Sequence, residues 1–493
     1  MATPLPSLNS IDPIAAWKPW QPSKADPWGH KWAAHLYRRA AFGSSRADLL
    51  EAEHLGFEGT LDLLVQGRPE ANGLLETLTD IGRVAAACDD GGEQLRGWWL
   101  YCMLHGGHPL REKLTLFWHN HFATSLAKVQ SVDMMFRQNC LLRVHALGQF
   151  GPLLQAISRD PAMLLWLDSN SNVKGKPNEN YARELMELFS LGVGHYTERD
   201  IRAAARAFTG WRTDGERFVF HPDIHDGGSK TVLGQTGPWD GGDIVRILLE
   251  QPATANFLVR KLYHFFISEN ANPPDAFLEP LCDSFRQSNY HIVGLVRTML
   301  ASRHFYSDHA FRQRIKSPVE FVLGAVQAVY RRYADADAEY RPLPQQLLVE
   351  RLSMMGQELF TPPNVKGWPG GRSWLNTSTL LARDNFAGAL AMGTLWGEMP
   401  PKLTQKASTA MLDRPVPPKA FDAARLPQEE AIARPEEIVR VLLELHVPGG
   451  IGPAARSKLV AYLAEGQPVG SALAQRVRET VHAILSMAEY QLA

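Results

Sequence analysis

Apolar side chains recur at steps of three and four residues along most of this 493-residue chain. Such steps return to the same face of a helix, so the pattern predicts amphipathic or buried helices. The helices expected in the first part of the chain cover 32–42, 45–57, 58–69, 93–105, 109–125 and 132–147. Those expected later cover 241–251, 254–269, 276–288, 292–302, 317–333, 343–357 and 377–395. The sequence therefore predicts a mainly α-helical fold with a large multi-helix body, without the strand–helix alternation of a Rossmann or barrel fold.

One stretch, near 217–234, has strand character instead. Phe218 and Phe220 alternate with other residues in RFVFHPDIHD, and Gly227-Gly228 separates them from KTVLGQTG. This pattern predicts a small β-hairpin or two short strands.

Composition divides the chain into four parts. Residues 1–28 are rich in Pro, Ser and Trp without periodicity, which predicts an extended N-terminal arm. Residues 29–398 form the main helical domain, and 399–434 carry six prolines, as a linker would. Residues 435–493 predict three more helices, a C-terminal helical subdomain that we expect to pack on the main body.

The charge balance and the N-terminus limit partners and location. Lys plus Arg (51) nearly equals Asp plus Glu (52), and no long basic run occurs, so nucleic acid is disfavoured as a partner. No apolar stretch approaches the roughly 18 to 20 residues that span a bilayer. The N-terminus MATPLPSLNSIDPIAAWKPW lacks the basic and apolar regions of a signal peptide. We expect a cytoplasmic protein as written, or an exported one whose leader was removed.

The helix expected over 109–125 breaks its own apolar pattern at His119, Asn120 and His121, within LTLFWHNHFATS. An ideal helix turns His121 about 200° away from His119, so both bind one metal only where the helix ends or distorts. Imidazole is a frequent metal ligand and proton carrier near neutral pH. We therefore treat both histidines as candidate metal ligands, His119 also as a catalytic group, and Asn120 as a substrate contact. Two core histidines bonded to backbone carbonyls are the structural alternative.

The segment NENYARELMELFSLGVGHYTERDI, 178–201, carries Glu184 and Glu187 at i and i+3 on one face of an expected helix. Because apolar residues surround the pair, at least one carboxylate is expected to point into the protein, where it needs a partner or a metal. Both are candidate catalytic groups. Asn180 and Arg183 are candidate substrate contacts, although surface salt bridges explain the same charges.

The segment HPDIHDGGSK, 221–230, gathers five ionisable side chains within ten residues, those of His221, Asp223, His225, Asp226 and Lys230. Irregular backbone can turn several of them toward one point, and loops often carry binding and catalytic residues. His221 and His225 are candidate metal ligands, Asp226 is a candidate catalytic carboxylate, and Lys230 is a candidate substrate contact.

The segment GWPGGRSWLN, 367–376, places Trp368, Arg372 and Trp374 around flexible glycines. Exposed Trp and Arg side chains can stack on a sugar or an aromatic ligand, which makes these three residues candidate substrate contacts. The alternative is that the indole rings fill the space beneath a loop.

Several common enzyme motifs are missing. The sequence contains no G-x-S-x-G, P-loop, G-x-G-x-x-G or H-E-x-x-H motif. Their absence disfavours standard serine hydrolases, nucleotide enzymes and zincins.

Six stretches together resemble the DUF1800 family, a bacterial family of unknown function. They are HLYRRAAFG, LREKLTLFWHNHFATS, NENYARELMELFSLGVGHYTERDIRAAARAFTGW, HDGGSKTVLG, QPATANFLVRKLYHFFI and MGQELFTPPNVKGWPGGRSWLNTSTLLARDNF. The resemblance implies no particular activity. It does imply export for many relatives, through leaders that this sequence lacks as written. Relatives often carry His or another residue where this chain has Phe189, so a site on that helix would differ here.

Two classes of function fit these motifs. The first is a metal-assisted hydrolase of a polymer such as a polysaccharide, with a divalent Zn, Mn or Fe ion generating the nucleophile. A metal-free variant would use Glu184 or Glu187 as proton donor and a second carboxylate as its partner. The second class is a non-catalytic helical scaffold or binding protein in which His, Asn and Glu lock helices together.

Overall fold

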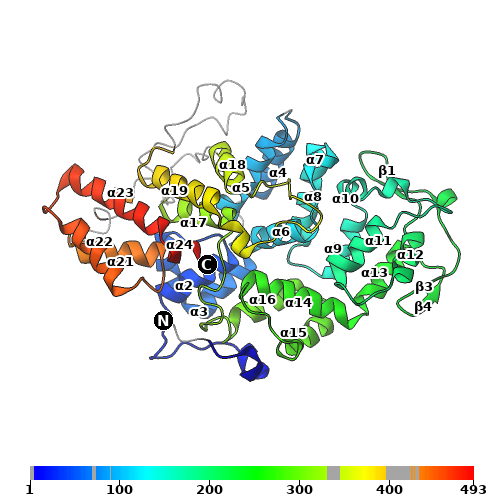
Figure 1. Cartoon of the computed structure of the whole chain (residues 1–493), viewed down its shortest axis with the longest axis horizontal. Coiled ribbons are helices and arrows are strands. Elements are labelled where there is room, and N and C mark those ends of the chain that lie inside the picture. The colour runs from blue at the N-terminus through cyan, green and yellow to red at the C-terminus, as the bar shows by residue number, and fades with distance from the viewer. Residues whose placement is uncertain are drawn as a thin grey trace.

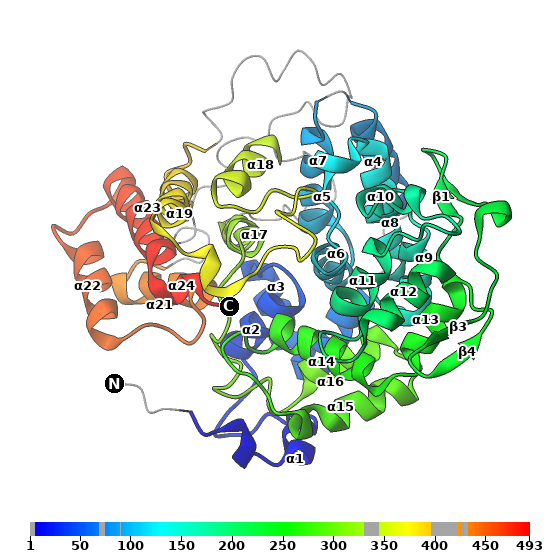
Figure 2. The same ribbon diagram turned by 45° about the vertical axis from the view of Figure 1, so that its right-hand side comes forward.

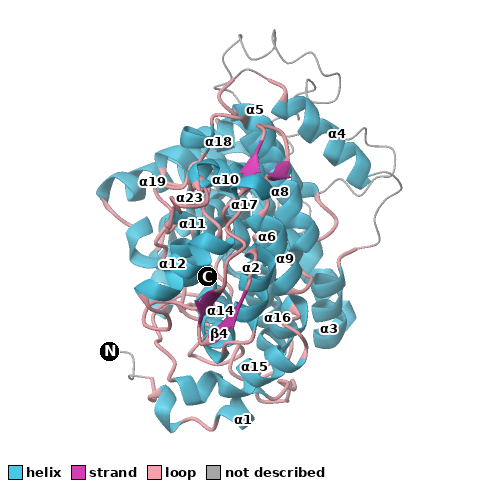
Figure 3. Cartoon of the chain, turned by 90° about the vertical axis from the view of Figure 1, so that its right-hand side faces the viewer, coloured by secondary structure: helices cyan, strands magenta, loops and turns pink. Residues whose placement is uncertain are grey.

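Helices make up nearly all of the regular structure in the computed structural model of the chain (Figure 3). The structure describes residues 5–68, 74–88, 90–329, 345–395, 423–425, 427 and 432–493. The mainly α-helical prediction is confirmed, and within these residues the strands form two small antiparallel sheets.

The first third of the chain runs through ten helices of the described part. They are α1 (Pro13–Trp17), α2 (His30–Ala40), α3 (Arg46–Gln66), α4 (Leu74–Ala86), α5 (Glu93–His105), α6 (Pro109–His121), α7 (Leu126–Val129), α8 (Val132–His145), α9 (Phe150–Ser158) and α10 (Pro161–Trp166). The two helices expected over 45–57 and 58–69 form the single element α3, which kinks at Gly56, where φ is +69°. The helix expected to reach residue 125 ends at His121.

The middle of the chain contains more helices, a π-helical segment and all four strands of the described residues. The helices are α11 (Asn180–Glu184), α12 (Glu198–Ala207), α13 (Gly241–Leu249), α14 (Pro252–Phe266), α15 (Asp275–Gln287) and α16 (Ile292–Ala301). The π-helical segment, Leu185–Ser190, follows α11 directly. Strand β1 (Trp211–Thr213) pairs with β2 (Phe218–Phe220), and β3 (Lys230–Val232) pairs with β4 (Gln235–Gly237). The strand region near 217–234 is therefore present, but β2 and β3 belong to different hairpins.

The last part of the chain is again helical. Its elements are α17 (Pro318–Val329), α18 (Gln345–Met354), α19 (Thr377–Ala391), α21 (Pro435–His446), α22 (Pro453–Ala464), α23 (Gly470–Ser486) and α24 (Ala488–Gln491). Helix α23 packs along α19, and α21 packs on α2 and α17, so the C-terminal helices lie against the main body (Figure 1). Most of the expected linker over 399–434 lies outside the described residues.

The N-terminal arm is anchored to the body. It contains the short helix α1, and the Trp17 indole donates a hydrogen bond to the Phe277 carbonyl at 2.8 Å. Trp17 and Trp20 are both buried. The arm is thus less extended than composition indicates, because its tryptophans are covered by α15 and neighbouring segments.

Helix α6 lies near the middle of the molecule (Figures 1 and 2) and is buried on almost all sides. It also carries charges there. The Glu112 carboxylate accepts two hydrogen bonds from the Arg143 guanidinium of α8, at 2.6 and 3.0 Å, and a third from the Trp99 indole at 3.2 Å. Bidentate pairing and a third donor satisfy a carboxylate that is only 4% exposed.

The next residue of α6, Lys113, makes a second buried ion pair. Its ammonium lies 2.5 Å from the Glu320 carboxylate of α17, which also accepts from Arg314 at 3.1 Å. Burial alone would raise the pKa of Glu320, but Arg314 and Lys113 hold that pKa well below its ordinary range. Helix α6 is thus tied by charge to α8 on one side and to α17 on another.

Among the described helices, none combines the length and the apolarity needed to cross a bilayer.

We predict that Glu320→Gln lowers the free energy of unfolding by about 3–5 kcal/mol, because it leaves the buried Lys113 charge without a carboxylate and leaves Arg314 with Glu269 alone. Chemical denaturation measures the effect. The control is Glu250→Gln, which removes an exposed carboxylate paired with Arg246 and should leave the midpoint unchanged. Equal midpoints for the two variants would contradict the stabilising role of the network.

Candidate functional site

The His119 side chain of α6 is surrounded by aromatic rings. Its ring packs edge-on against Trp99 and lies 5.8 Å from the Trp368 ring, centroid to centroid. The Nε2 atom accepts the backbone N–H of Phe360 at 3.2 Å. Burial lowers the pKa of His119 to about 3, so the imidazole is neutral. His119 therefore acts here as an acceptor that holds the chain at Phe360.

His121 uses both ring nitrogens within the protein. Nε2 lies 3.0 Å from the Phe189 carbonyl oxygen, and Nδ1 lies 3.0 Å from the Lys261 ammonium of α14. Since a carbonyl only accepts, Nε2 carries the proton and Nδ1 accepts from Lys261. Burial and the Lys261 charge keep the pKa of His121 well below its ordinary value. The two histidines thus face different neighbours, as the helical angle predicts.

Asn120, between the histidines, clamps the loop that follows α18. Its Oδ1 accepts the Trp368 backbone N–H at 2.7 Å, and its Nδ2 donates to the Trp368 carbonyl at 3.3 Å. Gly367 allows this approach, because a Cβ there would lie 2.1 Å from Asn120 Oδ1. Asn120 therefore positions the loop, and its expected contact with substrate stays a prediction.

Glu184 and Glu187 lie where α11 changes into the π-helical segment. The Leu191 N–H bonds to the Met186 carbonyl five residues earlier, the spacing that defines a π turn. Both carboxyl groups are partly buried. Burial, and then the charge of Glu187, raise the pKa of Glu184, and the Lys366 and Arg183 charges oppose this. Single π turns are frequent at functional sites.

The two carboxyls have different partners. Glu187 Oε2 accepts the Tyr196 hydroxyl at 3.1 Å. No ion pair or hydrogen bond to the Glu184 carboxyl was found among the described residues, although the charge of Lys366 acts on it. One carboxyl is therefore hydrogen-bonded, whereas its neighbour keeps its oxygens available.

Arg183 pairs with other carboxylates than Glu184 and Glu187, and Asn180 is exposed to solvent. The Arg183 guanidinium donates twice to Glu198, at 2.8 Å each, and once to Glu179 at 3.0 Å. Asn180 is exposed in the first turn of α11. The surface salt-bridge explanation thus accounts for Arg183.

The loop 221–230 is held by α12. The Asp226 carboxylate accepts from Arg206 Nε at 2.7 Å and from Nη2 at 3.2 Å, and these bonds lower the pKa of Asp226 to about 2. The buried Lys230 ammonium donates to the carbonyls of Asp226 and Gly228. Asp226 and Lys230 therefore fix the course of the loop.

His221 and His225 of that loop bond to backbone groups of their own surroundings and not to His119 or His121. His225 Nδ1 donates to the Thr209 carbonyl at 2.8 Å. The His221 backbone N–H bonds to the Gly210 carbonyl, and its side chain is partly exposed. Within the described residues, no group of three or more His, Cys, Asp or Glu side chains is placed to hold a metal ion. The expected ligand set of His119, His121, His221 and His225 therefore does not converge there.

Trp368 and Trp374 are buried, at 6% and 7% exposure, while Arg372 is exposed. The indole rings fill space beneath the loop, as the alternative interpretation proposed. They do not form the exposed stacking surface expected for substrate contacts.

Lys261 was missed from the sequence, because its neighbours in TANFLVRKLYHFF read only as an apolar helix. Its ammonium donates to His121 Nδ1 and, at 3.1 Å, to the Leu188 carbonyl of the π-helical segment. Burial lowers the pKa of Lys261 to about 8. Lys261 of α14 thus contacts both α6 and the π-helical segment.

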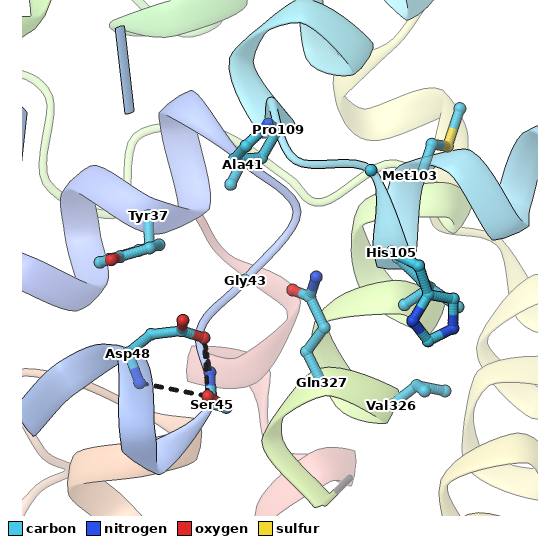
Figure 4. Close-up of a pocket in the computed structure, with 12 residues that line it drawn as sticks. Tyr37, Ala41, Gly43, Ser45, Asp48, Met103, His105, Pro109, Val326 and Gln327 are labelled. Atoms are coloured by element: carbon cyan, nitrogen blue, oxygen red, sulfur yellow. Dashed lines mark hydrogen bonds between the residues drawn. The ribbon is translucent and has the colours of Figure 1, made fainter. Parts of the chain in front are cut away.

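A pocket elsewhere, drawn in Figure 4, lies between α2, the first turn of α3, the end of α5 and α17. Its volume is about 60 Å³. On its rim, Asp48 accepts hydrogen bonds from the Ser45 backbone N–H and hydroxyl, at 2.8 and 2.7 Å. These two residues cap α3, and none of the candidate residues from the sequence lines this pocket.

A family model described as a protein of unknown function, DUF1800, matches residues 35–492. The chain belongs to the DUF1800 family. Neither the comparison with curated proteins nor the comparison with solved structures gave a match.

We predict that Asn120→Ala lowers the free energy of unfolding by about 1–3 kcal/mol, because it leaves the Trp368 backbone groups without their partner. It should also raise amide hydrogen exchange across 361–376, measured by mass spectrometry. Asn180→Ala, an exposed asparagine, is the matched control and should change neither quantity. Unchanged exchange in Asn120→Ala would rule out the clamp.

Proposed function

We propose that this protein is a hydrolase in which Glu184 donates a proton and Glu187 acts as its ionised partner. One observation carries the proposal. Two neighbouring carboxyls on a π turn have unlike surroundings, since burial and the charge of Glu187 raise the pKa of Glu184, while Glu187 accepts the Tyr196 hydroxyl. Paired titratable groups with diverging environments are the usual basis of acid–base assignments.

The chemistry of such a pair favours a glycosidic bond, and hence a polysaccharide, as substrate. A protonated carboxyl can protonate the leaving oxygen, while an ionised carboxylate activates water or attacks the sugar carbon. Lys366 stands on the loop that Asn120 clamps, and its charge acts on Glu184. It supplies an exposed cation beside the pair, where a polar polymer would approach.

The paired-carboxylate form is favoured over the metal-assisted form by the state of the histidines. Both nitrogens of His121 are hydrogen-bonded, and Nε2 of His119 accepts from Phe360. A metal on these atoms would have to displace those bonds. A hydrolase that uses a Zn, Mn or Fe cofactor is the alternative, and loss of activity on chelation would support it.

A second candidate function, a non-catalytic scaffold, is favoured by a different observation. His119, Asn120, His121, His225 and Asp226 each bond to backbone or to an arginine in their own neighbourhood. Such contacts lock helices together without chemistry. The two candidates differ in what they require of Glu184.

We predict that Glu184→Gln and Glu187→Gln each lower hydrolysis of a responsive polysaccharide by about 10²- to 10⁴-fold, the usual contribution of a general acid or base. Reducing-sugar release from a polysaccharide panel is the assay, with Glu250→Gln as control. Because Glu184 must be protonated and its pKa is raised, the wild-type rate should fall at a pH above the ordinary glutamic acid range. Dialysis against a chelator should leave the rate unchanged. Wild-type rates in both variants would overturn the proposal.

We also predict that Glu184→Gln raises the melting temperature near neutral pH. A carboxyl whose folded pKa is raised binds its proton more tightly in the folded state, so stability falls as pH rises from the unfolded pKa to the folded one. The penalty builds up as the pH rises above the ordinary glutamic acid range, and Gln removes it. The gain should vanish below about pH 4, where both states are protonated. If Glu184 instead had a stabilising scaffold role, Glu184→Gln would lower the melting temperature near neutral pH.

A further inference from the structure

A small cavity lies where α2, α17, α21 and α24 meet, and these elements lie side by side in Figures 1 and 2. Its volume is about 10 Å³, the room that one water-sized atom needs. The polar residues on its wall are Arg38, Ser44, Lys316 and Tyr490. None of them belongs to the proposed Glu184–Glu187 site.

Lys316 brings a buried ammonium to this cavity. The residue is 3% exposed, and its Nζ lies 3.3 Å from the centroid of the Tyr490 ring. The described residues give this ammonium no hydrogen-bond acceptor and no carboxylate within ion-pair distance. A cation–π contact attracts an ammonium but supplies no opposite charge.

Two further buried cations stand close by, and they too have only neutral acceptors. Arg38 donates to the His446 carbonyl. Arg383 donates to the Gln491 side-chain oxygen at 3.0 Å and to the Lys316 carbonyl at 2.8 Å. The buried carboxylate of this region, Glu320, is already bonded to Lys113 and Arg314. Cationic groups on and beside the wall thus outnumber the carboxylates. Burial, and then the Arg38 and Arg383 charges, lower the pKa of Lys316 well below its ordinary value, and an anion in the cavity would oppose that shift.

Tyr490 adds an unused donor. Its hydroxyl is buried without a hydrogen-bond partner. A Cβ on Gly324, another wall residue, would lie 3.9 Å from this hydroxyl, which places the hydroxyl at the cavity. Burial raises the pKa of Tyr490, so the hydroxyl keeps its proton and can donate.

We propose that this cavity binds one chloride ion, held by the Lys316 ammonium, the Arg38 guanidinium and the Tyr490 hydroxyl. Among anions, a monatomic one comes closest to the size of this cavity, whereas phosphate or a carboxylate-bearing ligand is far too large. A water molecule would satisfy the hydroxyl but would bring no negative charge to Lys316 and the two neighbouring guanidiniums. The ion would fasten α24 and the segment before α17 to α2.

Bromide replaces chloride and scatters anomalously, so crystals grown in sodium bromide test the site directly. We expect an anomalous peak inside the cavity, within hydrogen-bond distance of Lys316 Nζ and Tyr490 Oη. A cavity that is empty or holds only water in such crystals would overturn the proposal.

Thermal melting gives an independent readout. At equal ionic strength, the wild-type chain should melt about 2–3 °C higher in sodium chloride than in sodium gluconate, and the difference should saturate with chloride concentration. Tyr490→Phe keeps the ring under Lys316 and should lose most of this shift, as should Lys316→Met. Lys458→Met, an exposed lysine of α22, should retain it in full. A chloride effect of equal size in Tyr490→Phe and in the wild type would contradict the site, whether or not Lys316→Met folds.

Discussion

Polar side chains on the buried helix α6 hold the described parts of the chain together. Within ten residues, this helix pairs Glu112 with Arg143 of α8 and Lys113 with Glu320 of α17, and its last turn bonds to backbone near residues 189, 360 and 368. In a dry interior each of these groups must be satisfied, so each fixes the position of its partner more strictly than an apolar contact would. The histidines that interrupt the apolar pattern are therefore explained by packing, because they join segments that lie far apart in the sequence.

The same junction positions the proposed site. His121 and Lys261 hold the carbonyls of Phe189 and Leu188, which belong to the π-helical segment that follows Glu184. Asn120 fixes the loop that brings the charge of Lys366 to Glu184. The carboxyl pair thus rests on a rigid support built from α6 and α14. Rigid support of this kind is what general acid–base catalysis requires of its surroundings.

Much of the fold could be predicted from the sequence, because helices depend on local periodicity and on end signals. The bounds of α5 agree with the expectation to the residue. At the start of α12, Thr197 and Asp200 cap the helix as a pair, and the Thr-x-x-Asp spacing of such a pair can be recognised in a sequence. Strand pairing was harder to predict, because it depends on a second segment of the chain. Strand β2 pairs with β1, which precedes it in the sequence, and this pairing was not expected. The candidate site was only partly predictable. The glutamate pair could be found from its spacing, but nothing local shows that His121 would meet Lys261, 140 residues away in the sequence.

The central claim is that Glu184 and Glu187 are a coupled pair in which Glu184 holds its proton above the ordinary range. A carboxyl-carbon NMR titration of the full chain, with Glu184 assigned from the spectrum of Glu184→Gln, tests it most directly. The account predicts a Glu184 midpoint raised above that of exposed glutamates, which moves down toward them in Glu187→Gln because the neighbouring charge is gone. A Glu184 midpoint equal to that of exposed glutamates in the wild type would contradict the account.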